Sequence, residues 1–330
     1  MTGRHHRLLV IAALLAALVL AATLGAACSA RATDGAPGGS SASSGGTSAT
    51  PSVAVTASAA GDAQAAGARG ASKSDWKRVL AALASMQANV PTKPVVVLLG
   101  GSVARESTIS DSSWRAQIVA KGGPETLAWN LASGNRTMAQ NVAIVRKLPP
   151  GVHAIVYIGV NLGAFTSSQK TASITLPSPA PTAVSLKQPH RYSQSQILST
   201  AKKRALVKWW LTQRYPVYKA NFRTSAGVLE TLIKVCRSRG YKPVLFEMPR
   251  NTAIIRSSLN TPVARYRDKC RRLAKKYGIP WVSLVSAARL PNRDFYDLWH
   301  LVEPGRKVWQ NLLSAKTAAL LEKYGYDGGS

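Results

Sequence analysis

The feature of this sequence that most constrains its fold is the alternation of short apolar runs with longer stretches of helical character. Five runs rich in Val, Ile and Leu end at Gly, Pro or polar residues, as buried strands do: 94–99, 126–131, 152–158, 243–248 and 281–285. Helix-like stretches lie between and after them, at 138–147, 221–239, 262–277 and 304–324. Strands that alternate with helices predict an α/β fold, in which helices cover both faces of a parallel sheet.

The last of these stretches shows the helical pattern in most detail. Pro304 suits the first turn of a helix, and Gly325 suits the residue just after its end. Four apolar residues recur at helical spacing and are expected to form one buried stripe: Val308, Leu312, Ala315 and Ala319.

The first apolar run stops abruptly at Gly100, Gly101 and Ser102, and the chain then turns polar. Glycines permit a tight turn, so we expect Ser102 to stand at the carboxyl end of the first strand and to open a helix. Ligands of open parallel sheets bind beyond this end of the strands. The residues that follow the other strands are therefore candidates for a shared site: Gly134, Gly159, Asn161, Asp297 and His300.

These residue types are the parts needed for nucleophilic acyl transfer. His300 would remove the proton of Ser102, and Asp297 would hold the imidazole and stabilise its charged form. The amides of Ser102 and Gly134, with the side chain of Asn161, would form an oxyanion hole for the developing negative charge. The sequence contains no Cys and His cluster of the kind that binds a metal, and we expect no cofactor.

Elimination among the five histidines also favours His300 as the base. Two histidines precede the N-terminal apolar segment. His153 opens the third strand, at the wrong edge of the sheet, and His190 lies in a Pro-rich segment with no acid beside it in the sequence. Asp294 and Asp297, by contrast, both lie within six residues before His300.

Ser102, Gly134, Asn161 and His300, in this order, resemble the SGNH hydrolases, also called the GDSL-like family, whose name states these four residue types. The resemblance covers residues 94–324. It implies a three-layer α/β/α sandwich with a flavodoxin-like parallel sheet, and a metal-free serine esterase in which Asp297 completes the catalytic set.

Two positions depart from the family's pattern. The family commonly has Asp where this chain has Gly101, and it often has Asp where this chain has Leu162. Neither position donates a catalytic atom in the mechanism above. The departures favour a divergent branch, nearer to the exported enzymes that modify acyl groups on envelope glycans and teichoic acids than to the secreted lipases.

Four further residues are weaker candidates for substrate binding. Glu247, Arg250 and Asn251 follow the fourth strand, and Arg105 lies in the first turn after Ser102. All four are expected near the same edge of the sheet.

The interval 165–221 is too long for an ordinary strand-to-helix connection, so we expect an insert that serves as a lid, a binding loop or a disordered segment. Its final part interleaves aromatic and basic residues, including Trp209, Trp210 and Arg214. This pattern fits a groove for a sugar, a contact with a membrane, or ordinary helix packing.

The N-terminus predicts export. Basic residues precede the apolar segment 8–24, and small residues follow it, as in a secretory signal peptide or a membrane anchor over residues 1–28. Cys28 is a candidate for lipidation. Residues 29–72 are rich in Gly, Ala, Ser and Thr and predict a flexible linker, and the folded domain spans 73–330. We therefore expect an extracytoplasmic protein, secreted or membrane-anchored.

The net charge predicts anionic partners. The chain carries +29, of which Arg4 and Arg7 in the N-terminal segment contribute +2 and the linker nothing, so that +27 belongs to residues 73–330. Outside the cytoplasm, such a charge favours anionic envelope polymers or a membrane surface, and we expect no nucleic acid. Cys236 and Cys270 would form a disulfide in an oxidising compartment, although two buried thiols fit as well.

Three functions follow as expectations. The first is an esterase or deacylase that hydrolyses an O-acyl ester, acetyl or another short acyl group, on an envelope glycan or lipid. The second is an O-acyltransferase that passes the acyl group to a carbohydrate. The third is a non-catalytic, anchored binder of anionic wall polymers. We expect a monomer in each case.

Overall fold

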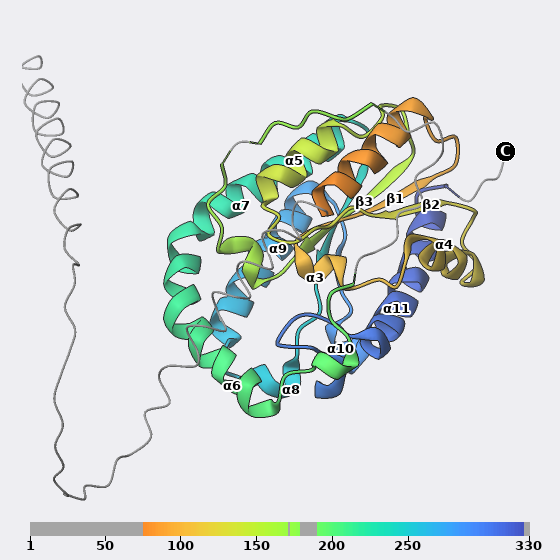
Figure 1. Cartoon of the computed structure of the whole chain (residues 1–330). Helices are drawn as coiled ribbons and strands as arrows, with labels where there is room; N and C mark the ends of the chain where they lie inside the picture. Colours follow the sequence, from red (N-terminus) through yellow and green to blue (C-terminus); the bar gives the residue numbers. More distant parts are fainter. Residues whose placement is uncertain (1–74, 171, 179–189, 327–330) are drawn as a thin grey trace, which may run out of the picture. The chain divides into compact units, whose positions relative to one another are not determined.

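The structure is a computed structural model that describes residues 75–170, 172–178 and 190–326 (Figure 1). The predicted signal or anchor, Cys28 and the linker lie outside the described residues. Among the residues that are described, no helix is both long enough and apolar enough to cross a membrane.

The core of the fold is a five-stranded parallel sheet in the order β2-β1-β3-β4-β5. Each predicted apolar run overlaps one strand, with ends that differ by at most two residues: β1 (Val95–Leu99), β2 (Leu127–Asn130), β3 (Ala154–Val160), β4 (Lys242–Glu247) and β5 (Trp281–Ser283). This is the flavodoxin-like order, in which the chain changes direction between β1 and β3. The carboxyl ends of these two neighbouring strands therefore mark the expected position of a ligand.

Helices cover both faces of this sheet (Figure 1). Along β1, the side chains of Val95, Val97 and Leu99 enter one apolar core, and those of Val96 and Leu98 enter the other. The first core is closed by the helix over residues 75–88, α5 (Met138–Arg146), α7 (Tyr215–Ser238) and α9 (Asn260–Tyr277). The second is closed by α4 (Asp111–Ala120), α10 (Val285–Ala288) and α11 (Glu303–Lys323). The predicted three-layer α/β/α sandwich is confirmed.

The predicted apolar stripe of the last helix is wrong. Val308 is 40% exposed, and the buried face of α11 carries Trp309 together with polar residues such as Gln310 and Thr317. Gln310 hydrogen-bonds side chains of α4, and Thr317 Oγ1 lies 3.0 Å from the hydroxyl of buried Tyr157. Because each of these polar groups has a hydrogen-bond partner on another element, its burial does not destabilise the fold. Because these residues are polar, the buried face of α11 could not be recognised from the apolar pattern of the sequence.

The predicted insert is helical in its second half. After the 3₁₀ turns η1 (Leu162–Phe165) and η2 (Gln194–Gln196), the chain forms α6 (Thr200–Trp209), the π-helix η3 (Trp210–Arg214) and then α7. Most of the aromatic side chains here pack into the core, among them Trp210, Tyr218 and Phe222. Trp209 is the exception, because half of its surface remains exposed.

The two cysteines of the folded domain are free, buried thiols, so the predicted disulfide is wrong. Cys236 lies on α7 and Cys270 on α9, and both have apolar surroundings. Burial raises the pKa of Cys236 to about 12 and raises that of Cys270 as well. Both residues therefore remain neutral core side chains near neutral pH.

Candidate active site

Ser102 stands at the carboxyl end of β1, as the sequence predicts. It is the first residue of the short helix α3 (Ser102–Arg105). Gly100 makes this turn possible: its φ is 155°, and a Cβ there would lie 2.7 Å from the Cβ of Ala104. On neighbouring β3, a Cβ at Gly159 would lie 2.7 Å from the carbonyl oxygen of Leu99. Because neither glycine has a Cβ, the backbone segments of β1, α3 and β3 can pack closely next to Ser102.

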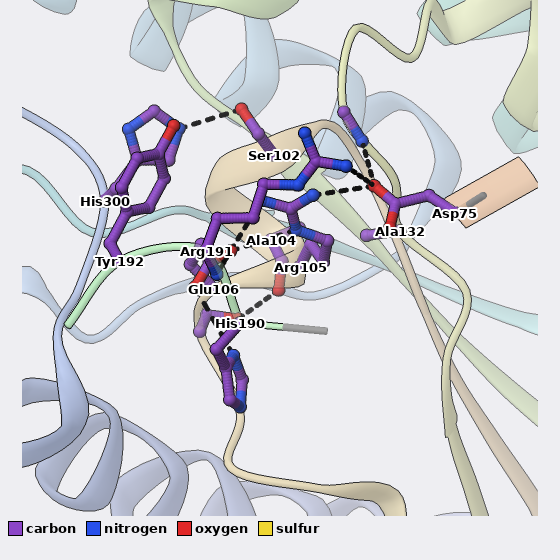
Figure 2. A network of polar contacts seen from close by, with 12 residues as sticks. Asp75, Ser102, Ala104, Arg105, Glu106, Ala132, His190, Arg191, Tyr192 and His300 are labelled. Atoms are coloured by element: carbon purple, nitrogen blue, oxygen red, sulfur yellow. Dashed lines mark hydrogen bonds and ion pairs between the residues drawn. The ribbon is translucent and has the colours of Figure 1, made fainter. Parts of the chain in front are cut away.

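The structure brings Ser102, His300 and Asp297 into one hydrogen-bonded line. Ser102 Oγ lies 2.8 Å from His300 Nε2, and His300 Nδ1 lies 2.8 Å from Asp297 Oδ2. Figure 2 shows the imidazole facing the serine hydroxyl, although the two residues are 198 positions apart in the sequence. No other carboxylate of the described residues lies within 4.0 Å of this imidazole.

The Asp297 carboxylate is buried and is kept ionised by its partners. Burial alone would raise its pKa, but the charge of His300 and hydrogen bonds from the His300 ring, the His300 amide and the Trp299 amide lower the pKa below its ordinary value. Both amides donate to Oδ1 at 2.8 Å, which leaves Oδ2 for the imidazole. This division of the two oxygens sets both the orientation and the tautomer of His300.

Asn251 holds the loop that carries the acid and the base. Its N–H donates to the carbonyl oxygen of Leu298 at 2.9 Å, and its side chain donates to Asn292 Oδ1 at 2.8 Å and to the Asp297 carbonyl at 3.3 Å. Asn251 is fully buried and does not line the pocket. The substrate contact expected of it is therefore wrong, and its observed bonds fix the geometry of the loop.

The insert also supports the loop that carries Asp297 and His300. Lys203 of α6 is buried, and its Nζ donates to the carbonyl oxygens of Asn292 and Phe295 at 2.9 and 2.7 Å. The N–H of Leu198 donates to the Tyr296 carbonyl at 3.0 Å. This part of the insert therefore hydrogen-bonds the catalytic loop and helps to position it, and does not merely cover the site.

Glu247 and Arg250 also lie away from the pocket, which overturns the substrate contacts expected of them. Glu247 is fully buried and pairs with Arg250. It also accepts a hydrogen bond from the hydroxyl of Tyr266 at 2.7 Å and lies 3.4 Å from Arg267. Because these partners all come from within the protein, the carboxylate joins β4 to α9 and is not presented to a ligand.

Two of the three residues predicted to supply oxyanion donors, Ser102 and Asn161, line the pocket. The N–H of Ser102 is the first of α3, so it has no acceptor within the helix. The side-chain oxygen of Asn161 accepts from the Ala164 amide at 3.0 Å, which turns the amino end of this pocket-lining side chain away from that turn. Because α3 has only four residues, its amides rather than a long-helix dipole supply the donor.

The third predicted donor, Gly134, is used elsewhere. Its N–H donates to Asp75 Oδ2 at 3.1 Å, and Gly134 is not among the residues that line the pocket. Asp75 comes from the helix over residues 75–88, far away in the sequence, so nothing near Gly134 signals this bond. In this geometry, the role expected of Gly134 in the oxyanion hole is wrong.

A pocket of about 250 Å³ opens beside Ser102 and His300. Its walls come from the ends of β1 and β3, the loop before α5, and the helical part of the insert. The polar side chains that line it, besides Ser102 and His300, are Asn135, Arg136, Asn141, Asn161, Thr166, Ser167 and Arg214.

A buried ionic network lies beneath Ser102 (Figure 2). Glu106 is its centre: it accepts from Arg105 Nη2 at 2.6 Å and from Arg306 Nη2 at 2.7 Å. Arg105 Nη1 also donates to Asp75 at 2.7 Å. Arg105 is thus buried within the network, and the substrate contact expected of it is wrong.

The network also holds the segment that begins at His190. His190 Nδ1 lies 3.3 Å from Glu106 Oε2, the N–H of Arg191 donates to Glu106 Oε1 at 3.2 Å, and Arg306 donates to the Tyr192 carbonyl at 2.7 Å. The sequence placed no acid near His190, but the fold supplies Glu106 from 84 positions earlier. The segment is therefore fixed beside the site.

Tyr192 connects this network to the imidazole. Its ring lies against His300, with a centroid distance of 4.7 Å (Figure 2). It also stacks on the ring of Tyr296, with a centroid distance of 4.2 Å. The imidazole is consequently held by Asp297 at one nitrogen and by an aromatic face alongside. Nothing in the sequence around Tyr192 pointed to this contact.

Glu106 gives the fold a predictable dependence on pH. Burial alone would raise its pKa, but contact with His190 and the charges of Arg105 and Arg306 lower it to about 2. A lowered pKa stabilises the fold above the ordinary carboxyl range, and this stability is lost as the pH falls from about 4.5 to about 2. We therefore expect Glu106→Gln to lower the free energy of unfolding by about 3 kcal/mol at pH 7.

Urea unfolding measured from pH 7 to pH 3 tests this expectation. The difference between the wild type and Glu106→Gln should shrink in the acidic part of that range. Glu125→Gln is the matched control, because Glu125 is 73% exposed and pairs only with Lys93 at the surface. A deficit for Glu106→Gln that stays constant across the range would contradict the assignment.

No protein-family model and no curated protein matches the sequence. Among the solved structures, the chain is similar to an extracellular lipase from Streptomyces rimosus, with 12% identity, a TM-score of 0.45, and coverage of 69% of this chain and 100% of that one. It is also similar to a carbohydrate acetylesterase family member from Sinorhizobium meliloti, with 10% identity, a TM-score of 0.41, and coverage of 70% and 100%. A GDSL-like lipase from Bacteroides thetaiotaomicron matches with 12% identity, a TM-score of 0.37, and coverage of 74% and 99%.

Proposed function

We propose that this protein is a serine esterase that hydrolyses an O-acyl ester through Ser102, His300 and Asp297. The observation that carries the proposal is the pair of 2.8 Å contacts, from Ser102 Oγ to His300 Nε2 and from His300 Nδ1 to Asp297 Oδ2. Nucleophile, base and orienting acid in hydrogen-bonded sequence are the arrangement that activates a serine hydroxyl.

The reaction proceeds in two halves. His300 Nε2 takes the proton of Ser102 as Oγ attacks the ester carbonyl, and it returns that proton to the departing alcohol oxygen as the C–O bond breaks. The acyl group is then bonded to Ser102 Oγ. A water molecule, deprotonated by His300, attacks this acyl-enzyme, and the proton returns to Ser102 as the free acid leaves. Asp297 stabilises the imidazolium in both halves.

The negative charge on the carbonyl oxygen requires donors that are already in place. The Ser102 amide and the amino end of Asn161 are the candidates at the pocket. One such donor is typically worth about 3 kcal/mol in the transition state. With Gly134 engaged by Asp75, these two carry the oxyanion hole in this proposal.

The setting of the reaction is part of the proposal. The N-terminal segment, with its basic, apolar and small-residue order, supports export and a location outside the cytoplasm, either secreted or anchored. The charge of +29 supports encounters with anionic envelope polymers or a membrane surface. We propose a short acyl group, such as acetyl, on an envelope glycan or lipid as the substrate.

Hydrolysis of 4-nitrophenyl acetate by the purified full-length protein tests the esterase directly. We expect nitrophenolate and free acetate in equal amounts, well above the rate without protein. Ser257→Ala, which changes an exposed serine away from the pocket, should behave as the wild type does. A wild type that does not exceed the background rate would refute the proposal.

Acyl transfer to a carbohydrate is the second candidate. Trp209, Trp210 and Arg214 of the insert line the pocket, so an acceptor sugar bound against them would compete with water for the acyl-enzyme. The same assay with an added oligosaccharide separates the two reactions. Acetylated oligosaccharide as the main product would favour transfer, and free acetate alone would exclude it.

Tyr192 provides a test of how the base is positioned. Removing its ring in Tyr192→Ala loosens His300, and because an aromatic pair is worth about 1 kcal/mol we expect kcat to fall five- to tenfold. Tyr192→Phe keeps the stacked ring and should restore kcat to within about twofold of the wild type. Steady-state kinetics, with urea unfolding as the check on folding, decide the matter. A phenylalanine variant as slow as the alanine variant would contradict the role of the ring.

A further inference from the structure

The pocket beside Ser102 is cationic. Among its described lining residues there are two arginines, Arg136 and Arg214, and no aspartate or glutamate. Arg136 comes from the loop before α5, and Arg214 ends the π-helix η3 of the insert. Neither residue takes part in the acyl-transfer steps above, so their positive charges require a separate explanation.

Arg136 is a buried cation without a paired anion. Its exposed fraction is 7%, and its Nε and Nη2 both donate to the neutral hydroxyl of Ser133 at 3.0 and 2.6 Å. Its guanidinium lies 4.3 Å from the ring of Trp76, and Nη1 has no partner among the described residues. Burying an unpaired charge is costly, so such a group beside a nucleophile points to a ligand that supplies the anion.

Arg136 remains charged near neutral pH. Burial lowers its pKa to about 9, with a further contribution from the charge of Arg78, while Asp75 acts in the opposite direction. No carboxylate of the described residues lies within 4.0 Å of the Arg136 guanidinium, although Asp75 pairs in this way with Arg105 and Arg191. The positive charge is therefore not cancelled by a direct partner.

Arg214 lies on the part of the pocket that the insert builds. Its Nη2 donates to the Thr166 hydroxyl at 2.7 Å, and Thr166 is itself a lining residue. This bond holds the guanidinium at the pocket with a neutral partner, which leaves its charge available. Single π-helical turns are frequent at functional sites, and this one sets the position of Arg214.

The remaining walls can accommodate a sugar ring. Trp209 lines the pocket with half of its surface exposed, which gives a flat ring face at the rim. The pocket is also lined by neutral hydrogen-bonding side chains: Asn135, Asn141, Asn161, Thr166 and Ser167. Apolar side chains such as Met138, Ile158 and Met248 complete the walls, as is usual for a small-molecule pocket in which a few polar groups fix the orientation of the ligand.

We propose that this pocket binds an O-acylated sugar that carries a negative charge, with the anionic group held by Arg136 and Arg214 and the sugar ring placed against Trp209. The proposal rests on the esterase function and specifies its substrate class. The shared chemistry is an anionic saccharide, and the anion is either a ring carboxylate, as in a uronic acid, or a phosphate.

Kinetics of the full-length protein with three matched acetate esters test the proposal. The esters are O-acetylated glucose, O-acetylated glucuronic acid and O-acetylated glucose 6-phosphate. We expect kcat/KM for at least one charged ester to exceed that of the neutral ester by about tenfold, which corresponds to about 1.4 kcal/mol. The preference between the two charged esters identifies carboxylate or phosphate as the anion.

Variants assign this preference to the pocket. In Arg214→Gln, the ratio of kcat/KM between the charged and the neutral ester should fall about threefold, because one of the two charge partners is lost. Arg223→Gln is the matched control: Arg223 is exposed on α7 outside the pocket, and the ratio should not change. Arg136→Gln should lower the same ratio by a similar factor. If the Arg136 variant does not fold because this residue is buried, the Arg214 variant alone decides the test.

The outcomes separate this proposal from the esterase itself. If 4-nitrophenyl acetate is hydrolysed but the charged and neutral sugar esters react equally well, the anionic subsite is refuted and the esterase stands. If no ester is hydrolysed, the esterase fails, and calorimetry with glucuronate and glucose 6-phosphate then decides about the subsite. Binding of either anion that is lost in Arg214→Gln supports the subsite, and absence of binding refutes it.

Discussion

Replacing Ser102 with alanine should reduce kcat for 4-nitrophenyl acetate by about 10⁴-fold or more. The hydroxyl of Ser102 is the atom that bonds to the acyl group, and His300 Nε2 lies 2.8 Å away to remove its proton. Without Oγ, only the oxyanion donors and general binding remain, and these leave a small residual rate. The variant should keep the wild-type free energy of unfolding to within about 0.5 kcal/mol, because Ser102 does not belong to the buried core.

Kinetics and urea unfolding on the same preparation check this expectation. His300→Ala should lose a similar factor, and the double variant should lose little more than either single variant, because the two residues act as a unit. Losses that multiply in the double variant would mean that Ser102 and His300 contribute independently, contrary to the mechanism proposed above.

Asp297→Asn should lower kcat by about 10⁴-fold through the tautomer of His300. The amide oxygen of asparagine can still accept the two amides that bind Oδ1, those of Trp299 and His300 at 2.8 Å. Its amino group then faces His300 Nδ1 in place of Oδ2. Because two donors cannot pair, Nδ1 must become the acceptor, and the proton moves to Nε2, where the imidazole can no longer accept the proton of Ser102.

Asp294→Asn is the matched control for this prediction. Asp294 is also buried and lies three residues earlier in the same loop, but its carboxylate is not within 4.0 Å of His300. Steady-state kinetics should give Asp294→Asn a kcat within about tenfold of the wild type, a far smaller loss than that of Asp297→Asn. Equal losses in the two variants would indicate that the loop's stability, and not the tautomer of His300, sets the rate.

The strands were predictable because most of their residues are buried in the core. All five residues of β1 are buried, so no polar side chain interrupts the apolar run, and the chain ends that run at Gly100 where β3 approaches through Gly159. The order of the ends along the sheet follows from the topology, which is why Ser102 and His300 could be expected together although 198 residues separate them.

Features that depend on long-range pairing were not predictable. The Gly134 amide bonds to Asp75, and the buried face of α11 contains Gln310 and Thr317, because partners on other elements satisfy these polar groups. Such pairing leaves no periodic trace in the sequence. The adjacent opposite charges of Arg105 and Glu106, directly after the strand and turn, were the one local sign of the network.

The insert had the least predictable role. Its length signalled a functional segment, but the contacts of Tyr192 with His300 and of Lys203 with the loop around Phe295 join segments about 100 residues apart. Arg136, which precedes the insert in the sequence, and Arg214, which lies within it, line the same pocket. Neither stands out by spacing or by its neighbours, so only the folded arrangement identifies them.

Covalent labelling tests the central claim most directly. A fluorophosphonate reacts with a serine only when a neighbouring base activates its hydroxyl, so the full-length protein should gain one adduct per chain, and peptide mass spectrometry should place it on Ser102. His300→Ala should prevent the labelling, and Ser257→Ala should not affect it. A protein that stays unlabelled, or carries its adduct on a different serine, would contradict the proposed active site.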